Sequence, residues 1–272
     1  MSLIHTIITK QPLEISRLNN FVTKIDNASY GERGEGTYYY WIEGKSTRGF
    51  DIAIDGEVIE IRNTVLSNRY DYELTNKIVE EILKLTDGII LSEEEEQVEA
   101  LPLFDNDRIV ETELNDCQFI QTLSKEHEDI GIYGPTRKVH FGKRLQNTYK
   151  KLNGQQLRDK MFETILVVNY ELPDFEYGNI MEVGNTADNK KIMKLLTNKT
   201  DYIIDKYDYI LLNTLDEKPI MITNEILNSM LPSNWTLVDE FTIVAPITGK
   251  VEWTALLKNA EKYNLWDSYR EN

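Results

Sequence analysis

The chain has 272 residues, of which 41% are apolar and 28% are charged. This mixture suits a globular protein with a sizeable core and excludes global disorder. Acidic residues outnumber basic ones by 46 to 30, giving a net charge of −16. Such a balance argues against general nucleic-acid binding, because that needs clustered cations.

No apolar run is long enough to cross a bilayer, and the N-terminus lacks the pattern of a secretory signal. Cys117 is the only cysteine, so neither an internal disulfide nor a cysteine-based zinc site is available. We therefore expect a soluble cytoplasmic protein without a membrane partner. Nothing in the sequence calls for a cofactor.

The first half of the chain predicts a β-meander with helices beside it. Asp55-Gly56 between two alternating runs is a strong hairpin signal, and residues 37–42 are rich in β-forming aromatics. We expect a short helix within residues 13–25. We expect strands at residues 3–9, 37–42, 50–54, 57–61 and 88–91.

The clearest helix is predicted by Leu74, Ile78, Ile82 and Leu85, which recur at helical spacing. Asn68 is suited to cap its start, and a turn at residues 87–88 ends it. The acidic stretch that follows, residues 102–116, is expected to be irregular, with one short strand near residues 109–110.

The second half opens with a basic helical segment, which is followed by a mixture of predicted strands and helices. The apolar run at 164–170 is typical of a strand buried on both faces. We expect further strands at 207–212 and 218–222, a hairpin from 235–238 and 241–245, and helices at 188–196, at 223–231 and around Trp253, Leu256, Leu257 and Ala260.

Together these elements predict an α+β fold of mostly antiparallel sheets with packed helices, in two subdomains. Residues 1–134 would form the first, with the meander, the long helix and an acidic C-terminal part at 87–129. Residues 135–272 would form the second, because glycines and Pro135 mark a loop near the junction.

Charge is strongly polarised along the chain. Residues 87–129 hold 14 acidic and 2 basic side chains, whereas residues 137–160 hold 8 basic and 1 acidic. Two interpretations are open. Either the two segments face and neutralise each other, which we favour, or one of them faces a partner or ligand.

The basic segment supplies the candidate anion site. Gly142-Lys143 resembles the end of a phosphate-binding loop, but the required first glycine is Arg137 and the residue after Lys143 is Arg144, so that motif fails. The pattern of cations around a flexible loop predicts a looser anion site. Its candidate residues are Arg137, Lys138, His140, Lys143 and Arg144.

No metal or nucleophile motif is present. The three histidines lack the spacing of a zinc site, so no metal ligand is nominated. Cys117 lies beside Asp116, an acidic setting that blunts thiol reactivity. No catalytic residue can be chosen from so many carboxylates.

The sequence supports two hypotheses about function. It does not indicate an oligomeric state. The favoured one is a non-catalytic, inhibitor-like or immunity-like interaction protein that binds a basic protein partner through its acidic surface. The candidate contacts are Glu93, Glu94, Glu95 and Glu96. The alternative is an enzyme acting on a phosphorylated or anionic small molecule at residues 134–144, with His140 as acid–base candidate.

Overall fold

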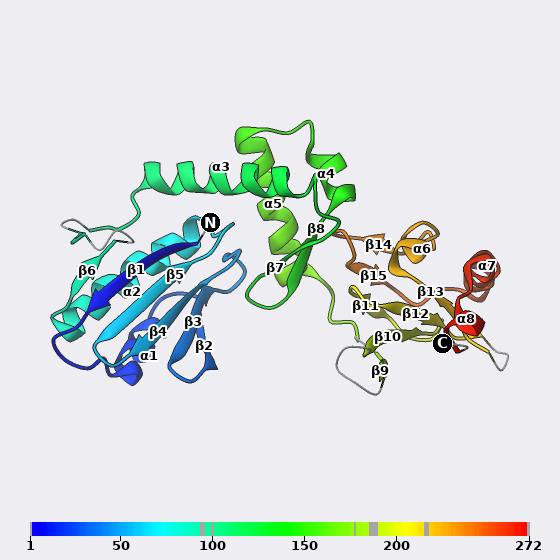
Figure 1. The fold of residues 1–272 in the computed structure, drawn as a ribbon, viewed down its shortest axis with the longest axis horizontal. Helices are drawn as coiled ribbons and strands as arrows, with labels where there is room; N and C mark the ends of the chain where they lie inside the picture. Colours follow the sequence, from blue (N-terminus) through cyan, green and yellow to red (C-terminus); the bar gives the residue numbers. More distant parts are fainter. Residues whose placement is uncertain are drawn as a thin grey trace. The chain divides into compact units, whose positions relative to one another are not determined.

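The structure is a computed structural model that describes residues 2–92, 96–98, 101–176, 178–184, 190–214 and 218–270. The chain forms two compact units, Met1–Glu171 (unit 1) and Leu172–Asn272 (unit 2) (Figure 1). The expected boundary near residue 134 therefore falls inside unit 1. The reason is that the segment after residue 134 pairs and packs with the segment before it.

The α+β class with mostly antiparallel sheets is confirmed. Unit 1 contains a six-stranded antiparallel sheet in the order β2-β3-β4-β5-β1-β6. Its strands are β1 (Leu3–Ile8), β2 (Ala28–Gly34), β3 (Thr37–Ile42), β4 (Phe50–Asp55), β5 (Val58–Asn63) and β6 (Ile89–Leu91). The predicted meander and the hairpin at Asp55-Gly56 are confirmed.

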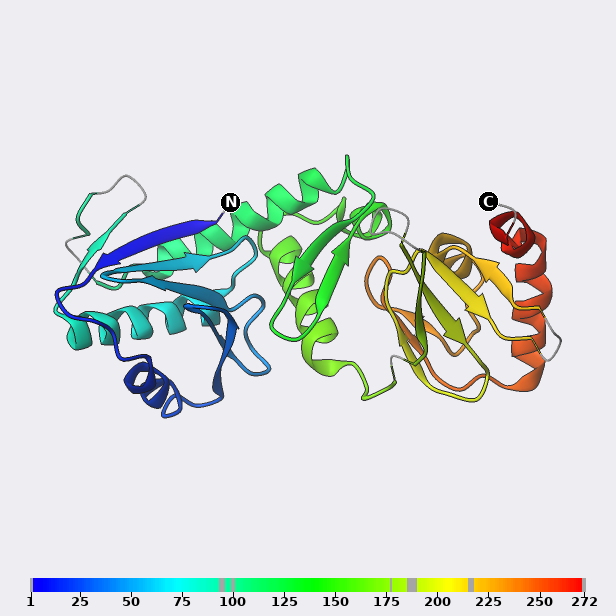
Figure 2. The same cartoon turned by 60° about the horizontal axis from the view of Figure 1, so that its bottom comes forward.

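Helices α1 (Ile15–Val22) and α2 (Arg69–Thr86) cover one face of this sheet (Figure 2). Alternation along the strands sends Tyr40, Ile52 and Ile61 into the core beneath the helices. The neighbouring residues on each strand therefore line the opposite face. That second face carries the candidate site described below.

The start of α2 confirms the predicted cap. Asn68 accepts hydrogen bonds from the backbone of Tyr70 and Asp71, while Asp71 accepts one from the Asn68 amide at 2.9 Å. This capping box satisfies amides that the first helical turn leaves without partners.

Residues expected to be irregular form the long helix α3 (Asn106–Leu123), so the strand predicted near 109–110 is wrong. Asp105 caps this helix, and Ile109, Cys117 and Ile120 lie on its buried side. The acidic residues that suggested a loop include Glu113 and Asp116, which are buried and hydrogen-bonded. The density of acidic residues indicated an exposed segment, but these two carboxylates accept backbone hydrogen bonds on the buried side of a helix.

The rest of unit 1 is a hairpin followed by helices. Its elements are β7 (Ile130–Tyr133), β8 (Lys138–Phe141), α4 (Lys143–Tyr149), α5 (Gly154–Leu166) and a π-helical turn (Val167–Glu171). The strand predicted at 164–170 is wrong. That apolar run ends α5 and continues into the turn, since a helix segment buried on most sides resembles a buried strand in sequence.

Unit 2 contains a four-stranded sheet, β13-β12-β10-β9, and a three-stranded sheet, β11-β15-β14. Its elements are β9 (Ile180–Val183), β10 (Lys191–Leu196), β11 (Tyr202–Ile204), β12 (Tyr209–Leu212), β13 (Ile220–Ile222), α6 (Asn224–Asn228), β14 (Thr236–Leu237), β15 (Ile243–Ala245), α7 (Lys250–Ala260) and α8 (Trp266–Arg270). A 3-10 turn, Glu261–Tyr263, follows α7.

Several predictions for the second half are confirmed, namely the strands within 207–212 and 218–222, the hairpin of β14 and β15, and helices α6 and α7. The helix predicted at 188–196 is wrong, because residues 191–196 form β10 between β9 and β12. Residues 188 and 189 lie outside the described residues. Among the described helices, none is both long and apolar enough to cross a membrane.

Candidate functional site

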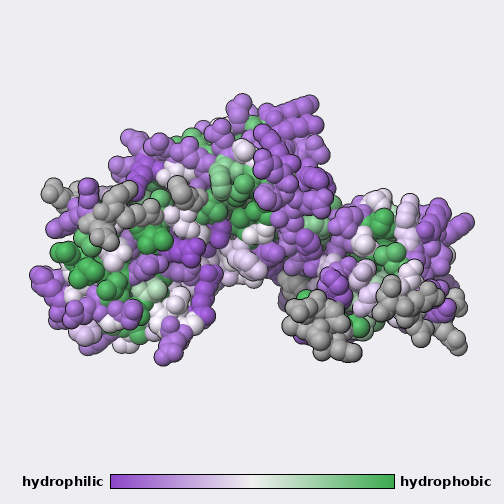
Figure 3. Space-filling model, viewed as in Figure 1, coloured by the Kyte–Doolittle hydropathy of each residue, from purple (hydrophilic) through white to green (hydrophobic). Residues whose placement is uncertain are grey.

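The acidic and basic segments contact each other within unit 1. Hydrophilic residues dominate the surface over α4 and β8, where the basic segment lies (Figure 3). Side-chain contacts between the two segments, among the described residues, include Arg158 Nη1 to Glu113 Oε2 at 3.2 Å, His140 Nδ1 to Asp129 Oδ1 at 2.8 Å, and Lys143 Nζ to Glu128 Oε1 at 3.1 Å.

The five residues of the predicted anion site do not line one common hollow. His140 is only 1% exposed and bonds Asp129, so it is placed in the interior of the unit. Lys143 is exposed and pairs with Glu128, and Arg144 follows it in the first turn of α4. Arg137 and Lys138 lie elsewhere, on a hollow that the other three do not line.

This hollow, which we call the basic cleft, has a volume of about 590 Å³. It lies between the face of the sheet that α1 and α2 leave open and the loop joining β7 to β8. Its lining residues are Arg33, Arg48, Asp51, Arg62, Thr64, Tyr133, Gly134, Pro135, Thr136, Arg137 and Lys138.

Sheet register brings together one side of the basic cleft. Tyr39 pairs with Asp51, and Asp51 pairs with Arg62, so one row crosses β3, β4 and β5 on the open face. Arg33 from β2 joins this row. Its Cζ lies 3.5 Å from the centroid of the Tyr39 ring, and its Nη1 donates to Asp51 Oδ1 at 3.1 Å.

Arg48 extends the row from the loop before β4. Its Nη1 donates to the Val65 carbonyl at 2.7 Å, and the Tyr39 hydroxyl donates to the Arg48 carbonyl. The buried Nε forms no hydrogen bond within the described part of the chain. Burial lowers the pKa of this guanidinium, yet an arginine remains charged at neutral pH. A partly buried cation of this kind favours a nearby anion.

The opposite side of the cleft is a loop whose position is fixed by Asn169, in the π-helical turn. Asn169 Oδ1 accepts from the backbone amides of Thr136 and Arg137, both at 3.0 Å, while its Nδ2 donates to the Ile165 carbonyl at 2.9 Å. A Cβ at Gly134 would lie 2.2 Å from Asn169 Nδ2, so a glycine is needed for this close approach. The loop is thus held in place from beneath.

Five cations and one carboxylate therefore line the basic cleft. The carboxylate, Asp51, already bonds Arg33, so the balance of charge around the hollow is positive in a protein whose net charge is −16. Such a concentration of positive charge attracts anions. Arginine forks suit phosphate and carboxylate oxygens in particular.

Sequence reasoning missed Arg33, Arg48 and Arg62, because each stands alone within the acidic half of the chain. The available signal was the alternation of the predicted hairpin at residues 50–61. This alternation places Asp51 on the face opposite Ile52. Strand register pairs Asp51 with Arg62, so Arg62 lies on the same face as Asp51.

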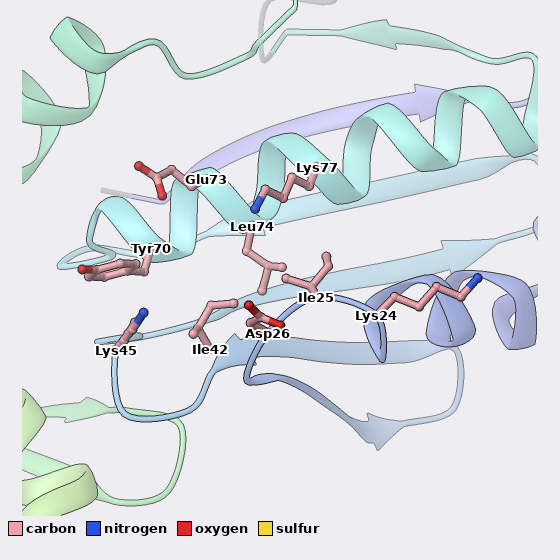
Figure 4. A pocket seen from close by; sticks show the side chains of 9 residues that line it. All are labelled: Lys24, Ile25, Asp26, Ile42, Lys45, Tyr70, Glu73, Leu74 and Lys77. Atoms are coloured by element: carbon pink, nitrogen blue, oxygen red, sulfur yellow. The ribbon is translucent and has the colours of Figure 1, made fainter.

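A second hollow in unit 1, of about 510 Å³, lies between the end of α1 and α2 (Figure 4). The side chains of Ile25, Ile42 and Leu74 converge at its base, and Lys45 Nζ lies 5.2 Å from the Tyr70 ring centroid. Its charged lining residues are Lys24, Asp26, Lys45, Glu73 and Lys77. Mixed charge gives this hollow less selectivity than the basic cleft.

No group of three or more histidine, cysteine, aspartate or glutamate side chains in the described part of the chain could hold a metal ion. Of the predicted partner-binding residues, Glu96 is exposed, and its carbonyl accepts from the Ser92 amide at 2.9 Å. Glu93, Glu94 and Glu95 lie outside the described residues.

Comparison with known families assigns a class to unit 1. Residues 2–166 match the family model described as a domain of unknown function, DUF4299, and the chain belongs to that family. The match covers nearly all of unit 1, including every residue that lines the basic cleft. No curated protein and no solved structure matches the chain at a significant level.

Proposed function

We propose that the DUF4299 region is a binding module for a phosphorylated or otherwise polyanionic small molecule, which it holds in the basic cleft. The observation that carries this proposal is the convergence of Arg33, Arg48, Arg62, Arg137 and Lys138 on one hollow. These residues come from distant parts of the chain. Only the fold brings them together.

Several features of the cleft suit an anion with more than one charged group. Arg33 and Arg48 are held by contacts to Tyr39, Asp51 and Val65, so binding would cost little side-chain entropy. Arg62 and Lys138 offer charge from opposite sides. Preorganised arginine forks on one side and a lysine on the other can bind separate oxygens of a diphosphate or a polycarboxylate.

Binding is favoured over catalysis by the placement of His140. The enzyme hypothesis used this residue as its acid–base group, but His140 bonds Asp129 in the interior and does not line the cleft. The lining residues include neither histidine nor cysteine. They are groups that hold an anion rather than groups that exchange protons near neutral pH.

A basic protein partner was the favoured hypothesis from sequence, and it has less support here. The acidic stretch uses Glu113, Asp116, Glu128 and Asp129 in contacts within unit 1. Carboxylates engaged in this way contribute less to a surface that would attract a cationic partner. We therefore rank anion binding first.

Isothermal titration of the full chain with pyrophosphate tests the proposal. We expect binding that weakens as salt is raised. Arg62→Gln and Lys138→Gln should each weaken it by about fivefold to tenfold, because each removes one charge contact of about 1 kcal/mol. Lys84→Gln is the matched control, since Lys84 is exposed on α2, pairs with Glu80 and lies outside the cleft.

Two results would overturn the proposal. One is equal affinity in wild type, Arg62→Gln and Lys138→Gln. The other is an absence of pyrophosphate binding together with salt-sensitive binding of poly-lysine, which would return the acidic surface to first place.

A further inference from the structure

Unit 2 contains a hollow of its own, with a volume of about 630 Å³, which is in the range of small-molecule sites. We call it the α7 hollow. It is lined by Thr197, Asn198, Lys199, Asn213, Thr214, Ile220, Lys250, Trp253, Thr254, Leu257, Lys258 and Glu261. None of these belongs to the region that matches DUF4299.

Sheet topology explains the position of this hollow. Strands β10 and β12 are neighbours and run parallel, with Leu196 paired to Leu212 at their carboxyl ends. Residues 197–199 leave β10 and residues 213–214 leave β12 at this same edge. The two loops therefore lie next to each other, and together with α7 they enclose the hollow.

Apolar side chains form the base of the α7 hollow. Ile220 at the start of β13 is 3% exposed and Trp253 on α7 is 5% exposed, so both also belong to the core of unit 2. Leu257 follows one helical turn after Trp253 on the same side of α7. An indole beside two aliphatic side chains suits a planar or aliphatic body.

Charge at the rim of the hollow is positive. Among the described lining residues, Lys199, Lys250 and Lys258 are basic and Glu261 is acidic. All three lysines are exposed, and the long flexible side chain of a lysine can reach a charged group near the mouth. The amides of Asn198 and Asn213 lie in the loops between the lysines and the strands, and they add hydrogen-bonding groups.

We propose that the α7 hollow binds a small amphipathic anion, with its apolar body against Trp253 and Leu257 and its acidic head among the lysines. An apolar base selects against a fully hydrated ion such as inorganic phosphate. The described lining residues include three cations and one carboxylate, a balance that disfavours cationic ligands. This inference is independent of the basic cleft, because the two hollows belong to different units.

The probe for this site is 1-anilinonaphthalene-8-sulfonate, an aromatic anion whose fluorescence rises when it enters an apolar site. Titration into the folded full chain should give saturable binding with quenching of tryptophan emission. Lys199→Gln with Lys258→Gln should weaken binding by about tenfold, through the loss of two charge contacts. Thr254→Trp, at an exposed position of α7 that lines the hollow, should block the probe by filling the space.

Two control variants separate this site from other surfaces. Lys262→Gln removes an exposed lysine just beyond α7 that does not line the hollow, and it should leave binding unchanged. Lys84→Gln, at an exposed position of α2 that lines neither hollow, should also leave probe binding unchanged. Unaltered affinity in both the double lysine variant and Thr254→Trp would overturn the proposal, as would an absence of saturable binding to the wild-type chain.

Discussion

Arg158 on α5 forms an ion pair with Glu113 on α3, with 3.2 Å between Nη1 and Oε2. Both side chains are largely buried, at 17% and 6% exposed. The other oxygen of Glu113 accepts from the backbone amide of Arg69 at 2.6 Å, at the start of α2. One carboxylate from the acidic stretch thus joins three helices of unit 1.

Glu113→Ala should lower the free energy of unfolding by about 1–3 kcal/mol, because it leaves the Arg69 amide and Arg158 Nη1 without this acceptor, whereas Arg158 keeps its bonds to Asp159 through Nε and Nη2. Urea unfolding gives this value. Glu80→Ala is the control, since it breaks an exposed pair with Lys84 and should cost under about 0.5 kcal/mol. Equal losses in the two variants would contradict a bridging role for Glu113.

Asp71 gives a second stability prediction. It is fully buried and accepts from the amides of Arg48, Gly49 and Asn68, at 3.1, 2.8 and 2.9 Å, and from the Thr47 hydroxyl. Asp71→Ala leaves these donors without an acceptor and should cost at least about 3 kcal/mol in urea unfolding. Asp71→Asn keeps one acceptor oxygen, so its loss should be smaller. A larger loss in the asparagine variant would sink this account.

Local signals predicted part of the fold well. The cap at Asn68, the turn at Asp55-Gly56 and the apolar stripe of α7 are each decided by neighbours in sequence, and the structure confirms all three. Capping and turn geometry depend on a few adjacent residues, so such elements can be read without knowing what packs against them.

Predictions of secondary structure were wrong where tertiary contacts decide between helix, strand and loop. Acid density at α3 indicated an exposed irregular segment, yet Glu113 and Asp116 are buried and accept backbone hydrogen bonds. The run at 164–170 was predicted as a strand but forms the end of α5 and the π-helical turn, whereas 188–196 was predicted as a helix but residues 191–196 form strand β10. Short apolar runs do not distinguish a buried helix from a buried strand, and only the partners of each run decide.

The residues of the basic cleft likewise fall into those that a local sequence pattern marks and those that only the fold brings to the cleft. Arg137 and Lys138 belong to a local run of cations that can be seen in the sequence. Arg62 reaches the same hollow through strand pairing, Arg33 through its contact with the Tyr39 ring, and Arg48 through the loop before β4 and its bond to the Val65 carbonyl. No local pattern marks them, because register joins residues that are far apart in the chain.

Cys117 should be inert in the folded protein. Its side chain is fully buried on α3, and burial together with nearby Asp116 raises the pKa of the thiol well above its usual range. We expect no measurable reaction with Ellman's reagent at pH 8 under native conditions, and one thiol per chain after unfolding in guanidinium. Fast native labelling would show that α3 opens away from the core.

Lys194 in unit 2 gives a prediction about pH. This residue of β10 is fully buried, and its Nζ forms no hydrogen bond among the described residues. It lies 5.0 Å from the ring centroid of Tyr202 and 5.9 Å from that of Tyr207. Burial lowers the pKa of Lys194 from 10.5 to about 8, although Glu176 acts in the opposite direction.

The sign of the pH effect follows from proton uptake. Between pH 8 and 10.5 the unfolded chain holds a proton on Lys194 that the folded chain releases, so the free energy of unfolding should rise with pH across that window. The gain across the whole window is on the order of 3 kcal/mol, at about 1.4 kcal/mol for each unit of pKa. Other titrating groups contribute equally to a matched variant and cancel in the difference.

Lys194→Met removes the buried cation while keeping similar volume. It should raise the free energy of unfolding at pH 7 and abolish the excess rise between pH 8 and 10, measured by urea unfolding at a series of pH values. Lys191→Met changes a partly exposed lysine of the same strand and should retain the rise. If both variants keep the wild-type slope, the buried amine of Lys194 does not titrate in this window, and its contacts with the two tyrosines hold it charged.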